Sequence, residues 1–258
     1  AAFASWSATP APTRGQIIGN MGRLLMEHKE DLVRLQAREI GKTLKECGGE
    51  IQEAIDTCLF FQSEGRRLYG QTVNSELPDK ELFTYRRPLG VCGIINACNF
   101  PSAVPFWKMI PAIMCGNTCV WKSPQDSPLL SFALARIMHQ AGLPDGVINL
   151  VHGKGSGAGQ YLVDAVDDGR VNKISFTGST AVGKMIGEVC WNHEPSIEQI
   201  ACSGTYSMAR SRDGSVYTWG RAMPTDNPVP ISRCLGRSGQ PGEPSVVTSL
   251  HQAGPPSL

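Results

Sequence analysis

The sequence is poor in the features that mark nucleic-acid-binding, membrane-spanning and metal-dependent proteins. Its 258 residues carry 24 basic and 23 acidic side chains, which gives a formal net charge of +1. A near-neutral chain has no electrostatic footprint for nucleic acid or for an acidic membrane surface. No apolar run reaches the roughly 20 residues that span a bilayer. No H-E-x-x-H motif occurs, and no paired Cys/His motif supplies a metal site. We therefore expect no nucleic-acid, membrane or metal partner.

The N-terminus and the cysteines point to an intracellular compartment. The first residues, AAFASWSATPAPTRG, lack the basic segment and the long apolar stretch of a signal peptide. The chain begins with alanine, which favours a fragment or a processed chain. The nine cysteines lie scattered in apolar segments, as is typical of buried, reduced thiols rather than of a disulfide framework. We expect the cytoplasm, or the mitochondrion if an N-terminal segment was removed.

Helical periodicity dominates the first part of the chain. Apolar side chains recur three to four positions apart over residues 13–44. We expect the two adjacent glycines at 48–49 to break the helix and a second helix to run from 51 to about 68. Short strands are predicted over 71–88.

Strands and helices alternate from residue 91 onward. Strands are predicted at 91–95, 118–121, 147–151 and 173–176, and helices at 103–113, 128–140, 159–166 and from 179 or 180 to about 189. Alternation at this spacing is typical of a parallel sheet with helices on its faces. The sequence therefore predicts an α/β fold with a Rossmann-like parallel sheet.

Three motifs lie at the ends of these predicted strands: IINACNFP at 94–101, VWKSP at 120–124 and FTGSTAVG at 176–183. Ligands of open α/β sheets bind at the carboxyl ends of the strands. Together, and at these spacings, the motifs resemble the N-terminal, NAD(P)-binding part of aldehyde dehydrogenases. The resemblance covers about residues 1–189. It implies NAD(P)-dependent oxidation of an aldehyde to a carboxylic acid.

Asn99 is the candidate catalytic residue. By resemblance, its side-chain amide donates to the oxyanion that forms when a thiolate attacks an aldehyde, and a fixed neutral donor suits this task because it does not titrate. The alternative is that Asn99 caps the turn before Pro101. The family usually has Trp before this Asn, whereas this chain has Cys98. The motif context favours the oxyanion role.

The resemblance also implies a set of cofactor-binding residues. Lys122 would hydrogen-bond the adenosine ribose hydroxyls, with a solvated strand-end lysine as the alternative. Ser179 and the helix start after it would receive the pyrophosphate. Where the family often has a Glu that selects NAD, this chain has Gln125, and an amide does not repel a 2′-phosphate. The cofactor is therefore NAD or NADP. The complete set is Ile95, Lys122, Gln125, Gly155, Gly159, Phe176, Thr177, Gly178, Ser179 and Gly183.

A glycine-rich loop, GKGSGA at 153–158, follows the predicted third strand. It fits G-x-G-x-x-G/A, but the acidic ribose ligand expected about twenty residues later is missing. The loop is interpreted as a close backbone approach to the cofactor at Gly155 and Gly159, or as an ordinary flexible turn. A Walker A interpretation of residues 178–184 fails because Met185, which has no hydroxyl, follows the lysine.

The residues that would carry out the oxidation do not occur in the 258-residue sequence. In the family, a cysteine in a G-Q-x-C segment attacks the aldehyde, and a glutamate in an E-L-G-G strand activates the water that releases the acid. Neither motif is present. Cys202 is a poor substitute, because it follows Gly178 by only 24 residues. We expect a truncated family member that lacks activity alone.

The composition changes after Trp191, where Pro, Gly and Ser become frequent. Residues 197–220 resemble one β-propeller repeat of the regulator-of-chromosome-condensation type, with a hairpin turn at 213–214. A single blade does not form a stable propeller. We predict two domains, an incomplete helical and NAD(P)-binding domain at 1–190 and a propeller-repeat-like fragment at 191–258, joined by gene fusion or a gene-model error.

Two alternatives concern function and assembly. The chain could instead be a non-enzymatic interaction module that uses the truncated domain and the propeller-like repeat. If it is active, the partner is a small-molecule aldehyde. A homo-oligomer is an open alternative, because residues 71–88 resemble the oligomerisation strands of the family.

Overall fold

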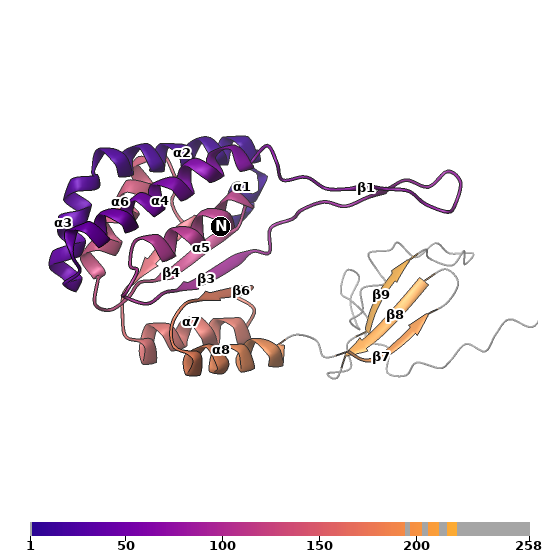
Figure 1. Cartoon of the computed structure of the whole chain (residues 1–258). Helices are drawn as coiled ribbons and strands as arrows, with labels where there is room; N and C mark the ends of the chain where they lie inside the picture. Colours follow the sequence, from indigo (N-terminus) through magenta and orange to yellow (C-terminus); the bar gives the residue numbers. More distant parts are fainter. Residues whose placement is uncertain (1, 194–196, 203–205, 212–215, 221–258) are drawn as a thin grey trace, which may run out of the picture. The chain divides into compact units, whose positions relative to one another are not determined.

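The computed structural model describes residues 2–193, 197–202, 206–211 and 216–220. The chain divides into two compact units, residues 1–189 and 190–258. The first unit joins an N-terminal helical layer to a parallel sheet, as Figure 1 shows.

The helical layer consists of α1 (Ala2–Ala8), α2 (Ala11–Glu27), α3 (Lys29–Ile40) and α4 (Leu44–Glu64). The expected helical segment at 13–44 is confirmed in type, but it is two helices that meet at His28, and α1 was not foreseen. Gly41 ends α3 in the left-handed conformation (φ 73°), which glycine adopts without a steric cost. Thr43 then begins α4, because its hydroxyl accepts a hydrogen bond from the Glu46 N–H at 3.3 Å.

The expected helix break at 48–49 is wrong. Both glycines lie inside α4, and the helix ends at Glu64 rather than near residue 68. Each glycine weakens a helix by about 0.5–1 kcal/mol. The opposite face of α4 buries a row of apolar side chains, and this burial outweighs the glycine cost. The row consists of Cys47, Ile51, Ala54, Ile55 and Cys58.

The sheet has four parallel strands in the order β5-β4-β3-β6. They are β3 (Val91–Ile95), β4 (Thr118–Lys122), β5 (Ile148–Val151) and β6 (Lys173–Phe176). The prediction of a parallel α/β sheet is confirmed. The chain moves outward from β3 to β5 and then returns to place β6 on the other side of β3. The strand order therefore reverses at β3, and ligands of open α/β sheets bind beside such a reversal.

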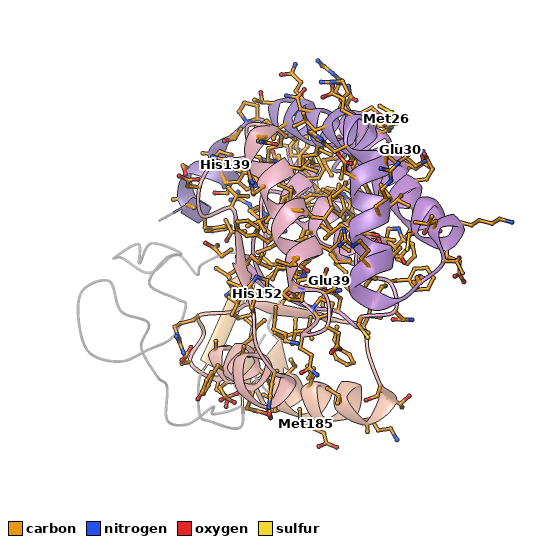
Figure 2. The ribbon with its side chains drawn as sticks, turned by 90° about the vertical axis from the view of Figure 1, so that its left-hand side faces the viewer. Met26, Glu30, Glu39, His139, His152 and Met185 are labelled. Carbon is orange, nitrogen blue, oxygen red and sulfur yellow. The ribbon has the colours of Figure 1, made fainter. Side chains whose placement is uncertain are left out.

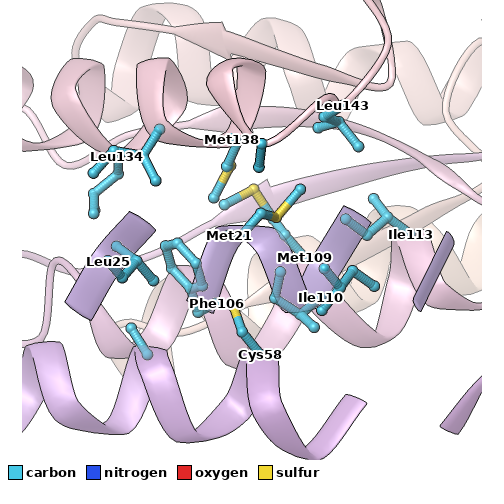
Figure 3. Packing of buried hydrophobic residues seen from close by; sticks show 14 of the residues in the cluster. Met21, Leu25, Cys58, Phe106, Met109, Ile110, Ile113, Leu134, Met138 and Leu143 are labelled. Carbon is cyan, nitrogen blue, oxygen red and sulfur yellow. The ribbon is translucent and has the colours of Figure 1, made fainter. Parts of the chain in front are cut away.

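Helices cover both faces of the sheet (Figure 1). On one face lie α5 (Ala103–Met114) and α6 (Pro128–Gln140), with α2 and α4 packed over them. Figure 3 shows the hydrophobic core between these layers, where Met21 and Cys58 approach Phe106 and Met109. On the other face lie α7 (Gln160–Asp167), preceded by the π-turn η1 (Gly155–Gly159), and α8 (Thr180–His193).

The expected short strands at 71–88 are confirmed as β1 (Thr72–Val73) and β2 (Leu82–Phe83), an antiparallel pair. The hairpin extends from the first unit as a long arm (Figure 1). In the second unit, β7 (Ile197–Cys202), β8 (Tyr206–Ser211) and β9 (Val216–Gly220) form an antiparallel sheet in chain order. The hairpin turn expected at 213–214 lies outside the described residues.

Candidate functional site

The strand register brings the strand-end residues of the three motifs into one row. Ile95, the last residue of β3, is paired with Lys122 on β4 and with Phe176 on β6. Lys122 is in turn paired with Val151 at the end of β5. Paired residues of neighbouring strands point to the same face. The row Val151–Lys122–Ile95–Phe176 therefore faces α7 and α8 at the carboxyl end of the sheet.

Lys122 is the charged member of this row. Only 6% of the residue is exposed, and its ammonium has no hydrogen-bond partner among the described residues. Burial lowers the pKa of Lys122, and nearby Asp126 opposes this effect in part. A cavity of about 310 Å³ lies between the sheet and α7, and both Lys122 and Ala158 line it. The Lys122 side chain is thus largely buried while its ammonium bonds no described residue, and such a group beside a cavity is suited to hold a polar ligand.

The glycine-rich loop forms the near wall of this site. It folds as η1, whose turn closes when the N–H groups of Gly157 and Gly159 donate to the Lys154 carbonyl, both at 3.2 Å. A Cβ atom added at Gly155 would meet no atom within 4 Å. The surface over Gly155 is therefore open, and a ligand can approach its backbone closely.

The FTGST segment connects β6 to α8. The Thr177 N–H continues the pairing with β3 by donating to the Ile95 carbonyl at 2.9 Å. The Ser179 hydroxyl accepts from the Val182 N–H at 3.4 Å, so Ser179 caps the start of α8. The space beside Gly178 is filled by the Phe176 ring, which lies 2.5 Å from where a Cβ would be. Gly183 also faces this ring, at 3.4 Å. Gly178 therefore makes room for Phe176, whereas a Cβ at Gly183 would only touch the ring.

The other two helices at this end of the sheet start at carboxylates of the helical layer. Glu39 of α3 accepts hydrogen bonds from the Leu129 and Leu130 N–H groups, at 2.7 and 2.9 Å, at the start of α6. Glu50 of α4 accepts from the Ser102 N–H at 3.3 Å at the start of α5. A helix start that already binds a carboxylate does not attract a phosphate. The starts of η1 and α8 remain for an anion.

Asn99 lies in the loop between β3 and α5, on a different cavity. This cavity has a volume of about 590 Å³ and is lined by Asn99, Cys98, Phe100 and residues of α3 and α4. Asn99 is exposed, and its side-chain amide has no hydrogen-bond partner among the described residues. The amide therefore does not cap the turn before Pro101. It is free to donate to a ligand.

Gln125 is exposed in the loop after β4. Three further residues at this end of the sheet were not singled out in the sequence. Asn96 is buried and accepts a hydrogen bond from Trp121 Nε1 at 2.8 Å, which ties the Asn99 loop to β4. Ser123 Oγ lies 2.7 Å from His152 Nδ1, and Figure 2 shows His152 between the helices of the two sheet faces. The sequence could have indicated all three residues, because each directly follows the last residue of a strand of the sheet.

Two classes of site find no support in the described part of the chain. Among residues 2–193 and the three later strands, no group of three or more His, Cys, Asp or Glu side chains could hold a metal ion. The same residues contain no helix both long and apolar enough to cross a membrane. The expectation that the cysteines are buried is only partly confirmed. Cys92 and Cys119 are buried, but Cys98 and Cys115 are exposed.

Known proteins resemble this chain in sequence. The chain is 40% identical over 192 residues to 2,5-dioxopentanoate dehydrogenase of Saccharolobus solfataricus, a match that covers 74% of this chain and 40% of that protein. It is 39% identical over 189 residues to an NADP(+) succinate-semialdehyde dehydrogenase of Escherichia coli, covering 73% and 39%. The chain thus spans about two fifths of the length of these curated relatives.

Solved structures give the same result. An NADP-dependent enzyme of E. coli matches with a TM-score of 0.71 and 39% identity, over 74% of this chain and 39% of that one. An NAD-dependent benzaldehyde dehydrogenase of Corynebacterium glutamicum matches with a TM-score of 0.69 and 39% identity, over 74% and 40%. The model of the aldehyde dehydrogenase family matches residues 1–199. By sequence, fold and strand-end motifs, this chain belongs to the aldehyde dehydrogenase family.

Proposed function

We propose that the first unit binds NAD or NADP at the carboxyl end of its sheet, between η1 and α8. The observation that carries this proposal is Lys122, a largely buried lysine whose ammonium bonds no described residue and which lies in register with Ile95 and Phe176. The open backbone at Gly155 fits a bound dinucleotide, because nothing in the described chain occupies that space.

Six residues of this site have separate roles in the proposal. Lys122 donates hydrogen bonds to the adenosine ribose. The start of α8, with Thr177 and Ser179, faces the pyrophosphate, and Gly155 and Gly159 allow the dinucleotide to approach η1. Gln125 carries no charge that would repel a 2′-phosphate, so we propose that both cofactors are accepted. When bound, NAD(P) supplies the hydride acceptor for aldehyde oxidation.

The reaction proposed for the complete site is oxidation of an aldehyde to an acid. Asn99 donates its side-chain amide to the oxyanion of the reacting aldehyde. The relatives named above act on semialdehydes, 2,5-dioxopentanoate and benzaldehyde by their names, and an aldehyde is the substrate class that we propose. The 258 residues contain neither the G-Q-x-C nor the E-L-G-G motif. We therefore propose that this chain does not oxidise aldehydes alone.

Titration of the purified chain with NAD⁺ and NADP⁺, followed by calorimetry, tests the binding proposal. We expect saturable binding of both, and at least about tenfold weaker binding after Lys122→Met, which removes a charge-assisted hydrogen bond. Binding that is unchanged in Lys122→Met would place the cofactor elsewhere. Aldehyde-dependent formation of NADH by the chain alone would overturn the proposal that it is inactive.

The second unit and the cellular context complete the proposal. We propose that 191–258 forms a separate domain, for which the antiparallel sheet of β7, β8 and β9 is the support. The propeller-repeat interpretation remains a proposal about these strands, and a partner-binding role would depend on them. We propose that the chain is cytoplasmic. We also propose that the β1–β2 arm joins copies of the chain, because Val73, Leu77 and Phe83 on it are exposed.

A further inference from the structure

The loop that carries Asn99 is fixed at its far end by a buried carboxylate. Glu50, on α4, is 2% exposed. Its Oε2 accepts a hydrogen bond from the Ser102 N–H at 3.3 Å, and the Ser102 hydroxyl can donate either to this oxygen (3.0 Å) or to Gln36 Oε1 (2.9 Å). Its Oε1 accepts from Gln36 Nε2 at 2.7 Å and pairs with the Lys42 ammonium. Glu50 is thus fully satisfied, as a buried charge must be.

Lys42 connects the same carboxylate to Asn99. It lies in the turn between α3 and α4. Its ammonium donates to the Asn99 backbone carbonyl at 2.8 Å and stands 4.1 Å from the centre of the Phe100 ring. One cation therefore holds the Asn99 backbone, the neighbouring aromatic ring and Glu50 together.

The Asn99 side chain takes no part in holding its loop, because its amide has no partner among the described residues. The loop backbone on either side fixes the Cα atom from which this side chain extends. Trp121 fixes the near end of the loop through Asn96, and the Glu50–Lys42 pair fixes the middle and the far end. A donor aimed at a developing oxyanion stabilises it only when it is held in place before the reaction.

We infer that Glu50 and Lys42 are positioning residues for Asn99: the helical layer sets the direction of the oxyanion donor through this ion pair. The inference rests on the proposed oxyanion role of Asn99. The competing explanation is that Glu50 merely caps α5. The chain contains a matched control for it, because Glu39 caps α6 in the same way and makes no hydrogen bond to the Asn99 loop.

The test uses the ¹⁵N-labelled full chain and four variants: Lys42→Met, Lys42→Arg, Glu50→Gln and Glu39→Gln. Three signals are followed. They are the order parameter of the Asn99 backbone amide, the Asn99 side-chain amide resonance (assigned by its loss in Asn99→Ala), and hydrogen exchange of the amides that the two carboxylates bind.

In Lys42→Met, we expect the order parameter at Asn99 to fall from about 0.85 to below about 0.6 and the side-chain resonance to move, while Ser102 keeps its protection. Glu50→Gln should produce both changes and speed exchange at Ser102 by about tenfold or more. Lys42→Arg, which keeps a charged donor, should restore the parent signals. Glu39→Gln should speed exchange at Leu129 and Leu130 and leave Asn99 unchanged.

The inference is overturned if the Asn99 signals are unchanged in Lys42→Met, or if Glu39→Gln moves them equally. Lys42→Met decides the matter should Glu50→Gln fail to fold, because Lys42 lies at the edge of the network, with 20% of its side chain exposed. None of these signals requires cofactor. If the parent chain does not bind NAD⁺ but the Asn99 signals respond to the variants as expected, the proposed function is rejected and the positioning role stands.

Discussion

At the residue scale, Lys122 is largely buried, and its ammonium makes no hydrogen bond to a described residue. Burial removes part of the water that would normally solvate this ammonium group, so the pKa of Lys122 lies below the ordinary 10.5. Between the lowered pKa and 10.5, the unfolded chain binds more protons than the folded chain, so the stability of the free chain rises with pH in this window.

The same shift predicts how cofactor binding depends on pH. Because the charged form of Lys122 attracts the anionic dinucleotide, the affinity for NAD⁺ should fall as pH rises through the lowered pKa. Lys122→Arg keeps its charge in this range and should bind with little change. Fluorescence titration from neutral pH to pH 10.5 measures both. Parallel pH profiles for the two proteins would contradict the assignment.

Gly155 allows binding to be separated from folding. Gly155→Ala adds a methyl group that meets no atom within 4 Å, so the Tm should not fall. A ligand that lies on this backbone would collide with the methyl group, and NAD⁺ affinity should fall at least about fivefold, the effect of ~1 kcal/mol.

A neighbouring glycine is the control. Gly153 has φ 147°, and a Cβ there would lie 2.8 Å from the Ala158 Cβ. Gly153→Ala should therefore lower the Tm as well as the affinity. Equal affinity for Gly155→Ala and the parent would show that the dinucleotide does not approach η1.

At the scale of elements, β3 packs closely against Ile174 of β6 and Leu162 of α7 because its middle residue, Gly93, has no side chain. A Cβ at Gly93 would lie 2.5 Å from Ile174 Cδ1 and 3.2 Å from Leu162 Cγ. Gly93→Ala should destabilise the first unit by about 1–3 kcal/mol, as measured by urea unfolding. A loss of less than ~0.5 kcal/mol would mean that α7 shifts freely on the sheet.

Gly48→Ala should have the opposite effect. Gly48 lies inside α4, and an added Cβ meets no atom within 4 Å. Alanine restricts the unfolded chain and favours a helix, so we expect a gain of about 0.5–1 kcal/mol. The same urea measurement decides it, and a destabilised variant would imply that α4 depends on glycine at this point.

The type and place of most elements could be predicted from the sequence, with Gly48 and Gly49 as an exception. Strand–helix alternation located every strand of the parallel sheet and the helices between them, because their apolar faces are complete within each segment. At 48–49, the glycines gave a strong local signal against a helix, and the tertiary packing of α4 overrode it.

The residues that we propose to bind cofactor could be grouped from the sequence for a related reason. Parallel strands place their carboxyl ends at one edge of the sheet. Residues at the strand ends therefore lie close together, however many residues separate them in the sequence. The Glu39 and Glu50 contacts could not be predicted. Glu39 is 90 positions from Leu129 and Glu50 is 52 positions from Ser102, and no periodicity specifies which glutamate reaches which helix start.

At the scale of the whole molecule, the chain consists of two units, and every residue proposed to bind cofactor lies in the first. A ligand stabilises only the unit that binds it, by about 2.7 kcal/mol at a concentration of 100 Kd. Scanning calorimetry with saturating NAD⁺ should therefore raise the transition of the first unit alone. An equal rise in the transition of 190–258 would show that the units unfold together.

The occupied starts of α5 and α6 have a practical consequence for work in solution. Sulfate and phosphate from a buffer bind readily at open helix starts, and at this end of the sheet the starts of η1 and α8 bind no carboxylate of the described residues. Small anions should therefore bind at the same helix starts at which we propose that the dinucleotide binds. They should act as simple competitors of NAD(P), and the choice of buffer salt sets the apparent affinity.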